Sequence, residues 1–134
     1  MNASDVSDPL ADSEVVLRAI AMPASANPAG DIFGGWLLSQ MDLAGGSVAM
    51  RRARGRVVTV AITAIVFKRP VYVGDEVTCY AQIVELGRTS ITVKVEVFAR
   101  RARTAEQIEV TEGVFTYVAV DSEHKPRPVG EPQD

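Results

Sequence analysis

The stretch GGWLLSQMDLAGGSVAMRR, residues 34–52, decides how the rest of the chain must fold. It contains no proline and is rich in leucine, methionine and alanine, a composition that favours a helix. Its apolar side chains cover most of a helical wheel and leave a narrow polar stripe of Ser39, Asp42 and Gly46. A helix that is apolar on nearly all sides is expected to be buried.

Two adjacent glycines, Gly45 and Gly46, lie in the interior of this predicted helix. Each costs about 1 kcal/mol of helix propensity relative to alanine. The close approach of another segment of backbone would explain why the sequence accepts that cost, so we predict such an approach here.

After the helix the apolar pattern becomes that of β-strands. Residues 57–67 are apolar at odd and even positions alike, which is expected of a central strand covered on both faces. Residues 89–101 alternate with a period of two, so Thr92, Lys94 and Glu96 share a face that should meet water or a polar interface.

Weaker patterns complete the secondary structure. Strands are predicted at residues 14–22, 76–86 and 108–120, and residues 23–33, with two prolines and a glycine, form a loop. One long helix and several antiparallel strands require a sheet that curls around the helix, which is an α+β architecture. A lone sheet of this size leaves an edge uncovered, and a dimer joined edge to edge would cover it.

The length and composition indicate one globular domain. We expect this domain at residues 14–121, with flexible tails at residues 1–13 and 122–134 that are polar or rich in proline. The net charge of -3 gives no reason to expect nucleic-acid binding. Neither a targeting signal nor a membrane span is evident, so a cytoplasmic protein is expected. Cys79 lies in an alternating apolar run and is predicted to be a buried structural thiol.

Several common catalytic chemistries lack the residues that they need. The one histidine, His124, lies in the polar C-terminal segment, so a nucleophile–histidine pair has no base. One histidine and one cysteine do not make a zinc site, and no phosphate-binding Gly-Lys-Ser/Thr motif follows the glycines at positions 30, 34 and 35. Those glycines do open a helix, whose N-terminal N–H groups favour negative charge.

Carboxylate chemistry remains, and Asp42 is its main candidate. A charge on an otherwise apolar helix is costly to bury without a partner. Asp42 is therefore either a functional residue or the solvent edge of the helix, capped by a hydroxyl such as that of Ser39. Asp31 is a competing carboxylate, for which a loop or N-cap role is the simpler interpretation.

Basic residues form two clusters. Arg51, Arg52, Arg54 and Arg56 follow the helix, and Arg100, Arg101 and Arg103 lie in the last hairpin. The first cluster either complements the helix C-terminus or binds phosphates. The turn sequence Arg88-Thr89-Ser90 offers a guanidinium and two hydroxyls, and is a further phosphate-site candidate.

Residues 21–42, AMPASANPAGDIFGGWLLSQMD, closely resemble bacterial acyl-CoA thioesterases of the YciA type. Further matches occur in order along the chain: GRVVTVA at residues 55–61, Phe67-x-x-Pro70, Val73-Gly-Asp75, Gly87-Arg88 and FTYVAVD at residues 115–121. The combination is far more specific than any single glycine motif.

The resemblance implies a hotdog fold, in which a curved antiparallel sheet wraps a long central helix. It implies homodimers, usually assembled as a trimer of dimers, with dimers or tetramers as alternatives. It also implies a catalytic pair of Asp42 on the helix and Asn27 in the preceding loop, contributed by opposite subunits. Asp31 then becomes a supporting residue.

The resemblance further implies hydrolysis of fatty acyl-CoA without any metal or cofactor, coenzyme A being part of the substrate. Asp42 would act as base or as nucleophile, and the N–H groups near Gly34 and Gly35 would receive the thioester oxygen. Substrate-binding positions by this resemblance are Asp31, Phe33, Thr59, Lys68, Arg88, Thr89 and Ser90. The acyl-chain preference stays open.

Three other functions compete with hydrolysis. A hotdog hydratase would need a histidine beside its carboxylate, and a DNA-binding regulator would need a reading module for which the chain has no room. A non-catalytic acyl-CoA-binding protein is the main alternative, and the presence of both Asn27 and Asp42 argues against it.

Overall fold

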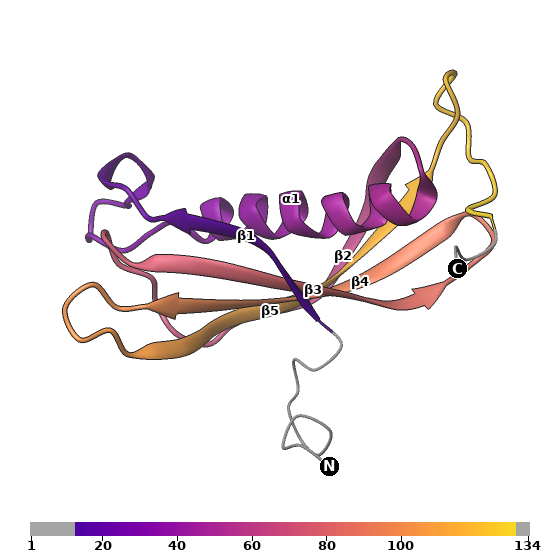
Figure 1. Cartoon of the computed structure of the whole chain (residues 1–134). Helices are drawn as coiled ribbons and strands as arrows, with labels where there is room; N and C mark the ends of the chain where they lie inside the picture. Colours follow the sequence, from indigo (N-terminus) through magenta and orange to yellow (C-terminus); the bar gives the residue numbers. More distant parts are fainter. Residues whose placement is uncertain (1–12, 131–134) are drawn as a thin grey trace, which may run out of the picture.

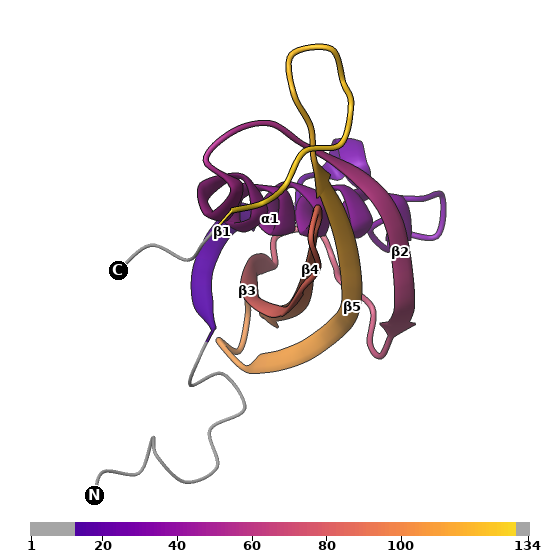
Figure 2. The ribbon, with the colours of Figure 1, turned by 90° about the vertical axis from the view of Figure 1, so that its right-hand side faces the viewer.

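A long helix, α1 (Gly34–Ala53), lies against one face of a five-stranded antiparallel sheet in the computed structural model, which describes residues 13–130 (Figure 1). The sheet has the order β1-β3-β4-β5-β2. Its strands are β1 (Glu14–Ile20), β2 (Val57–Phe67), β3 (Glu76–Leu86), β4 (Ser90–Arg100) and β5 (Gln107–Ala119). Figure 2 shows the sheet curving around the helix, with β1 and β2 on opposite sides.

The helix and all five strands lie within one or two residues of their predicted positions. The predicted loop at residues 23–33 contains a single short 3-10 helix, Pro23–Ser25. The α+β architecture with a sheet curled around one helix is therefore confirmed. None of the helices within residues 13–130 is both long and apolar enough to cross a membrane.

The predicted central position of residues 57–67 is wrong. β2 pairs with β5 alone and forms an edge of the sheet. Its side chains Val60, Ile62 and Val66 are exposed. Val57 and Ile65 of this strand pack against the core, but its exposed apolar side chains have no cover within the described part of this chain. They mark an edge with an apolar surface.

The helix is buried on one side only, which differs from the prediction. Leu37, Met41 and Val48 contact the core, whereas Leu43 is 62% exposed and Met50 is 50% exposed. The sheet of a single chain can cover only one side of a helix, so the opposite apolar side remains open.

The close approach predicted at Gly45 occurs, but a side chain makes it. A Cβ atom on Gly45 would lie 2.5 Å from the hydroxyl oxygen of Tyr117, and one on Gly46 would lie 3.6 Å from the ring. The prediction of a second backbone segment is wrong because the ring of Tyr117 fills the space over the two glycines.

The inward face of β4 forms the centre of the core. Ile91, Val93, Val95 and Val97 are fully buried, as the period of two predicts. Cys79 on β3 is also fully buried, and burial raises the pKa of its thiol to about 12, in agreement with the predicted structural thiol.

Two residues of the segment 122–130, Arg127 and Val129, contact the body of the protein, whereas residues 122–126 are exposed. The flexible tail expected at residues 122–134 stays a prediction. The guanidinium of Arg127 donates to the carbonyl of Ala53 at the end of α1, at 2.8 Å. The backbone N–H of Val129 donates to the carbonyl of Arg88 at 2.8 Å, and the side chain of Val129 is buried. Residues 1–12 and 131–134 of the expected tails lie outside the described residues.

Candidate active site

Asp42 lies on α1, where it faces the sheet beside β2 and β5. The hydroxyl of Thr59 donates to its Oδ1 at 2.8 Å, and the hydroxyl of Tyr117 donates to the same oxygen at 3.0 Å. Ser39, the predicted capping hydroxyl, instead donates to the carbonyl of Trp36 at 2.7 Å. The reason is that Ser39 lies three residues from Trp36, within reach of that carbonyl on the preceding helical turn.

Tyr117 was not predicted as a site residue. Its side chain is only 1% exposed, and its pKa is held well above the ordinary value, first by burial and then by the charge and hydrogen bond of Asp42. A tyrosine among the inward positions of β5, next to Phe115 and Ala119, is the signal that could have found it, because a buried hydroxyl needs a partner.

Asn27 organises the loop before the helix. Its carboxamide oxygen accepts from the backbone N–H groups of Ala29 at 2.9 Å and Asp31 at 3.0 Å. The backbone N–H of Asn27 donates to the carbonyl of Asp31. With the oxygen engaged twice, the NH₂ group is the part of Asn27 that can donate to another molecule.

Asp31 does not cap the helix, although a loop or N-cap role was predicted. Phe33 is the N-cap residue, and no side chain bonds the first turn from that position. Asp31 instead pairs through its backbone with Tyr72. Its carboxylate is two residues too early in the chain for the N-cap position.

A cavity of about 320 Å³ lies at the N-terminus of α1. It brings together four of the predicted site residues, Asn27, Asp31, Gly34 and Lys68. Phe33, which is 49% exposed, adjoins this lining in the chain. The apolar part of the lining is Ile32, Leu37, Phe67, Pro70 and Val71.

The first amide groups of α1 are available beside this cavity. The amides of Trp36 and Leu37 donate to the carbonyl of Phe33. Among the hydrogen bonds of residues 13–130, none uses the amide of Gly34 or Gly35 as donor. Free N–H groups at a helix N-terminus attract negative charge.

Asp42 is separated from this cavity within one chain. It lies eight residues along the helix from Gly34, which corresponds to about 12 Å of helix length. Asp42 is not among the residues lining the cavity. The structure therefore assembles the predicted residues as two groups: Asn27, Asp31 and Gly34 in one, and Asp42 with Thr59 in the other.

The turn Arg88-Thr89-Ser90 lies at the C-terminal end of α1, near residues 121–130. Its backbone is fixed by bonds from Gly87 to the carbonyl of Ser90 and from Ala119 to the carbonyl of Thr89, both at 2.9 Å. The side chain of Arg88 is exposed. The predicted phosphate-site candidate is thus an exposed guanidinium on a rigid turn.

The arginines after the helix are partly engaged. Arg51 pairs with Glu14, and Arg52 donates to the carbonyl of Gly130 at 3.0 Å. Both lie in the last turn of α1. This position is consistent with complementing the helix C-terminus, and phosphate binding by the same cluster stays a prediction.

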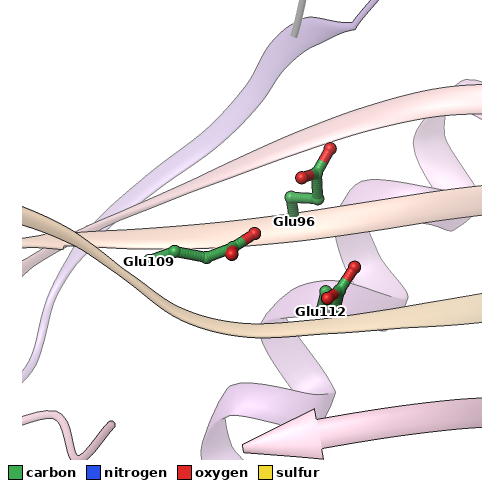
Figure 3. Close-up of side chains that lie close together, drawn as sticks. All are labelled: Glu96, Glu109 and Glu112. Carbon is green, nitrogen blue, oxygen red and sulfur yellow. The ribbon is translucent and has the colours of Figure 1, made fainter. Parts of the chain in front are cut away.

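A second polar group lies on the face of the sheet turned away from α1. It consists of Glu96, Glu109 and Glu112, whose carboxylate oxygens lie within 4.8 Å of one another (Figure 3). Lys68 lies 2.5 Å from Glu109 and 2.7 Å from Glu112. We call these four residues the Glu–Lys cluster.

This face was expected to meet water or a polar interface. Glu96 is only 6% exposed and lies beside the polar side chains of Glu109 and Glu112, so its surroundings are polar without being open to water. Burial raises the pKa of Glu96, and a hydrogen bond with Glu109 raises it further, against the opposing charge of Lys94. Hydrogen bonding to Lys68 lowers the pKa of Glu112. The ammonium of Lys68 therefore offsets part of the negative charge of Glu109 and Glu112.

Comparison with known proteins identifies the family of this fold and site. The model of the thioesterase superfamily matches residues 29–106. The acyl-CoA thioester hydrolase YciA of Salmonella typhimurium is 50% identical over 119 residues, which cover 87% of this chain and 90% of that protein.

Two solved structures have the same fold. A hexameric thioesterase from Yersinia pestis has a TM-score of 0.86 and 49% identity, covering 90% of this chain and 98% of its own. A hexameric broad-specificity acyl-coenzyme A thioesterase, solved as a mutant with one aspartate changed to alanine, has a TM-score of 0.85 and 45% identity, covering 88% and 87%.

These similarities define a hotdog-fold thioesterase. The chain belongs to the thioesterase superfamily, and its predicted resemblance to the YciA type is confirmed.

Proposed function

We propose that this protein hydrolyses the thioester bond of fatty acyl-CoA, releasing the fatty acid and CoA. The observation that carries the proposal is the carboxylate of Asp42, held by two hydroxyl donors on a helix that is otherwise apolar. Relatives of this chain that are about half identical to it are acyl-CoA thioester hydrolases.

Asp42 supplies the reactive group. As a base it takes a proton from water, whose oxygen attacks the thioester carbonyl; the C–S bond then breaks, and the CoA sulfur leaves and takes up that proton. As a nucleophile it attacks the carbonyl itself, the C–S bond breaks, CoA leaves as the thiolate and an anhydride forms; water then hydrolyses the anhydride to the fatty acid and restores Asp42. Both routes end in the same products and neither uses a metal or a cofactor. One solved relative was studied as a variant with an aspartate changed to alanine, which supports a functional role for an aspartate in this family.

Asn27 and the start of the helix complete the site. The NH₂ group of Asn27 orients the attacking water or the carboxylate. The thioester oxygen accepts from the amides of Gly34 and Gly35, which have no acceptor within residues 13–130. Such donors are worth several kcal/mol when they face the charge that develops in the transition state.

We infer that each site is shared by two copies of the chain. Asn27 and Asp42 belong to separate groups in one chain, and the exposed apolar edge of β2 lies beside Thr59, a partner of Asp42. Pairing β2 with its copy would cover this edge and bring the loop of one subunit toward the helix of the other. Hexameric relatives support assembly of three such dimers.

The acyl chain and the nucleotide of the substrate bind to different parts of the protein. The acyl chain lies along the apolar side of α1 that the sheet leaves uncovered, near Phe33 and Leu43. The nucleotide phosphates meet exposed groups of the Arg88-Thr89-Ser90 turn. The ammonium of Lys68 is already engaged with two glutamates, so a phosphate would have to compete with them.

A release assay tests the proposal. Purified protein is mixed with acyl-CoA substrates of increasing chain length, and free thiol is measured with and without excess chelator. We expect turnover on medium or long chains that the chelator leaves unchanged. Binding of acyl-CoA without turnover on any chain length would instead support the alternative, a non-catalytic acyl-CoA-binding protein.

A further inference from the structure

The two oxygens of Asp42 have different surroundings. Thr59 and Tyr117 both donate to Oδ1, at 2.8 and 3.0 Å. The hydrogen bonds found within residues 13–130 leave Oδ2 without a donor. One oxygen therefore fixes the carboxylate, while the other stays open for a proton or an electrophile.

Tyr117 is suited to fix the carboxylate and unsuited to react. It comes from β5, is fully enclosed, and reaches across to α1. Burial, the charge of Asp42 and their hydrogen bond all raise the pKa of its phenol. The hydroxyl therefore keeps its proton and acts as a donor only.

The hydroxyl of Tyr117 has two acceptors within reach on Asp42, and the protonation state of the carboxylate decides which of them it bonds. It lies 3.0 Å from Oδ1 and 3.1 Å from the backbone carbonyl oxygen of Asp42. A hydroxyl has one proton to donate, and a charged carboxylate is the stronger acceptor. When Asp42 takes up a proton during the reaction, the backbone carbonyl offers the hydroxyl an alternative acceptor.

Gly45 makes room for this contact. A Cβ atom at this position would lie 2.5 Å from the hydroxyl oxygen of Tyr117 and 3.2 Å from two of its ring carbons. Any larger residue would displace the tyrosine from Asp42. The glycine in the helix interior thus has a role in the site, and its cost in helix propensity is about 1 kcal/mol.

We propose that Tyr117 is a positioning residue that holds Oδ1 of Asp42 and leaves Oδ2 as the reacting atom, and that Gly45 is required for this contact. This role rests on the proposed thioester hydrolysis for its effect on rate. The contact itself is a property of the folded protein and can be tested without substrate.

The kinetic test uses Tyr117→Phe, which keeps the ring and removes the hydroxyl. We expect kcat to fall by about ten- to hundredfold, the range that one hydrogen bond to a charged group supports, while KM for acyl-CoA stays within about twofold. Tyr80→Phe is the matched control, since Tyr80 packs against Phe98 on the other face of the sheet. A kcat within about twofold of wild type in Tyr117→Phe would overturn the proposal.

Gly45→Ala tests the same contact from the helix. Alone it should lower kcat about as much as Tyr117→Phe does. In the Tyr117→Phe background it should add less than about threefold, because the two substitutions break one interaction. Independent, multiplying losses in the double variant would show that Gly45 acts through something other than Tyr117.

A spectroscopic test does not depend on activity. The side-chain carboxyl carbons of aspartate are labelled with ¹³C, and the signal of Asp42 is assigned by its loss in Asp42→Asn. We expect this signal to move in Tyr117→Phe and Gly45→Ala and to stay in place in Tyr80→Phe. An unmoved signal in Tyr117→Phe would overturn the positioning role, whereas a moved signal in a protein without turnover would overturn the proposed function alone.

Discussion

The carboxylate of Asp42 and the carboxylates of the Glu–Lys cluster lie on opposite sides of the sheet and differ in their surroundings. On the helix side, Asp42 receives two neutral hydroxyl donors. On the other side, Glu109 and Glu112 are paired with the ammonium of Lys68. Hydroxyls stabilise a negative charge without cancelling it, whereas the ammonium of Lys68 offsets part of the charge of the two glutamates.

This difference separates a carboxylate that is available for chemistry from carboxylates that are held in ion pairs. Asp42 receives its hydroxyl donors on Oδ1 and has no hydrogen-bond donor on Oδ2 within residues 13–130. Glu96, the most buried member of the Glu–Lys cluster, has a raised pKa and shares a hydrogen bond with Glu109. A buried acidic residue is therefore not by itself a sign of catalysis; the donors around it decide its role.

The largest expected effect comes from removing the charge of Asp42. Asp42→Asn preserves the size of the side chain and its acceptor for both hydroxyls. Turnover on acyl-CoA should fall by at least about two decades, the usual contribution of a general base, while affinity changes much less. Glu96→Gln should keep turnover within about twofold, and Asp31→Asn should cost less turnover than Asp42→Asn.

Thiol release and acyl-CoA binding, measured on the same preparations, check this prediction. Near-normal turnover in Asp42→Asn, combined with collapse in Glu96→Gln or Asp31→Asn, would mean that the reactive carboxylate has been assigned to the wrong group.

Removing Lys68 should affect stability instead of turnover. Lys68→Met leaves three carboxylates close together without this ammonium, so we expect the free energy of unfolding to fall. Lys94→Met is the matched control, with its ammonium at 3.8 Å from Glu112, and should lose less. Denaturant unfolding at pH 7 measures both, and equal losses would contradict a special role for Lys68.

The smallest effect concerns the pH dependence of stability. Because the pKa of Glu96 is raised in the folded protein, its stabilising effect is complete below the ordinary pKa of glutamate and is lost as the pH rises through the raised value. Glu96→Gln should remove this loss, so at pH 8 its melting temperature should exceed that of wild type.

Melting curves between pH 4 and pH 8 check the sign. The two proteins should converge toward acid pH, where the carboxyl of Glu96 is protonated in both the folded and the unfolded state of wild type. A variant that is less stable than wild type at pH 8 would show that the ionised carboxylate stabilises the fold.

The sequence predicted the helix and every strand because their apolar periods are local. It also singled out Asp42, because one charge on an apolar helix is conspicuous. The order of strands is not local, and so β2 was expected at the centre of the sheet although it forms the edge.

Contacts between distant residues were the other limit. Tyr117 lies 75 residues from Asp42 along the chain, and the local sequence around either residue does not predict their contact. The same holds for Lys68, which was predicted to bind substrate and bonds two glutamates of β5. Gly45 gave a partial signal, because its cost in helix propensity predicted a close neighbour but did not identify Tyr117 as that neighbour.

The central claim is that Asp42 of one subunit works with Asn27 of another, and mixing two inactive variants tests it most directly. Asn27→Ala and Asp42→Ala chains are co-refolded in equal amounts, and mass spectrometry confirms that mixed oligomers form. Random pairing places both wild-type residues in one site of each mixed dimer, so the account predicts recovery of about a quarter of wild-type turnover. Mixed oligomers that remain as inactive as their parents would contradict it.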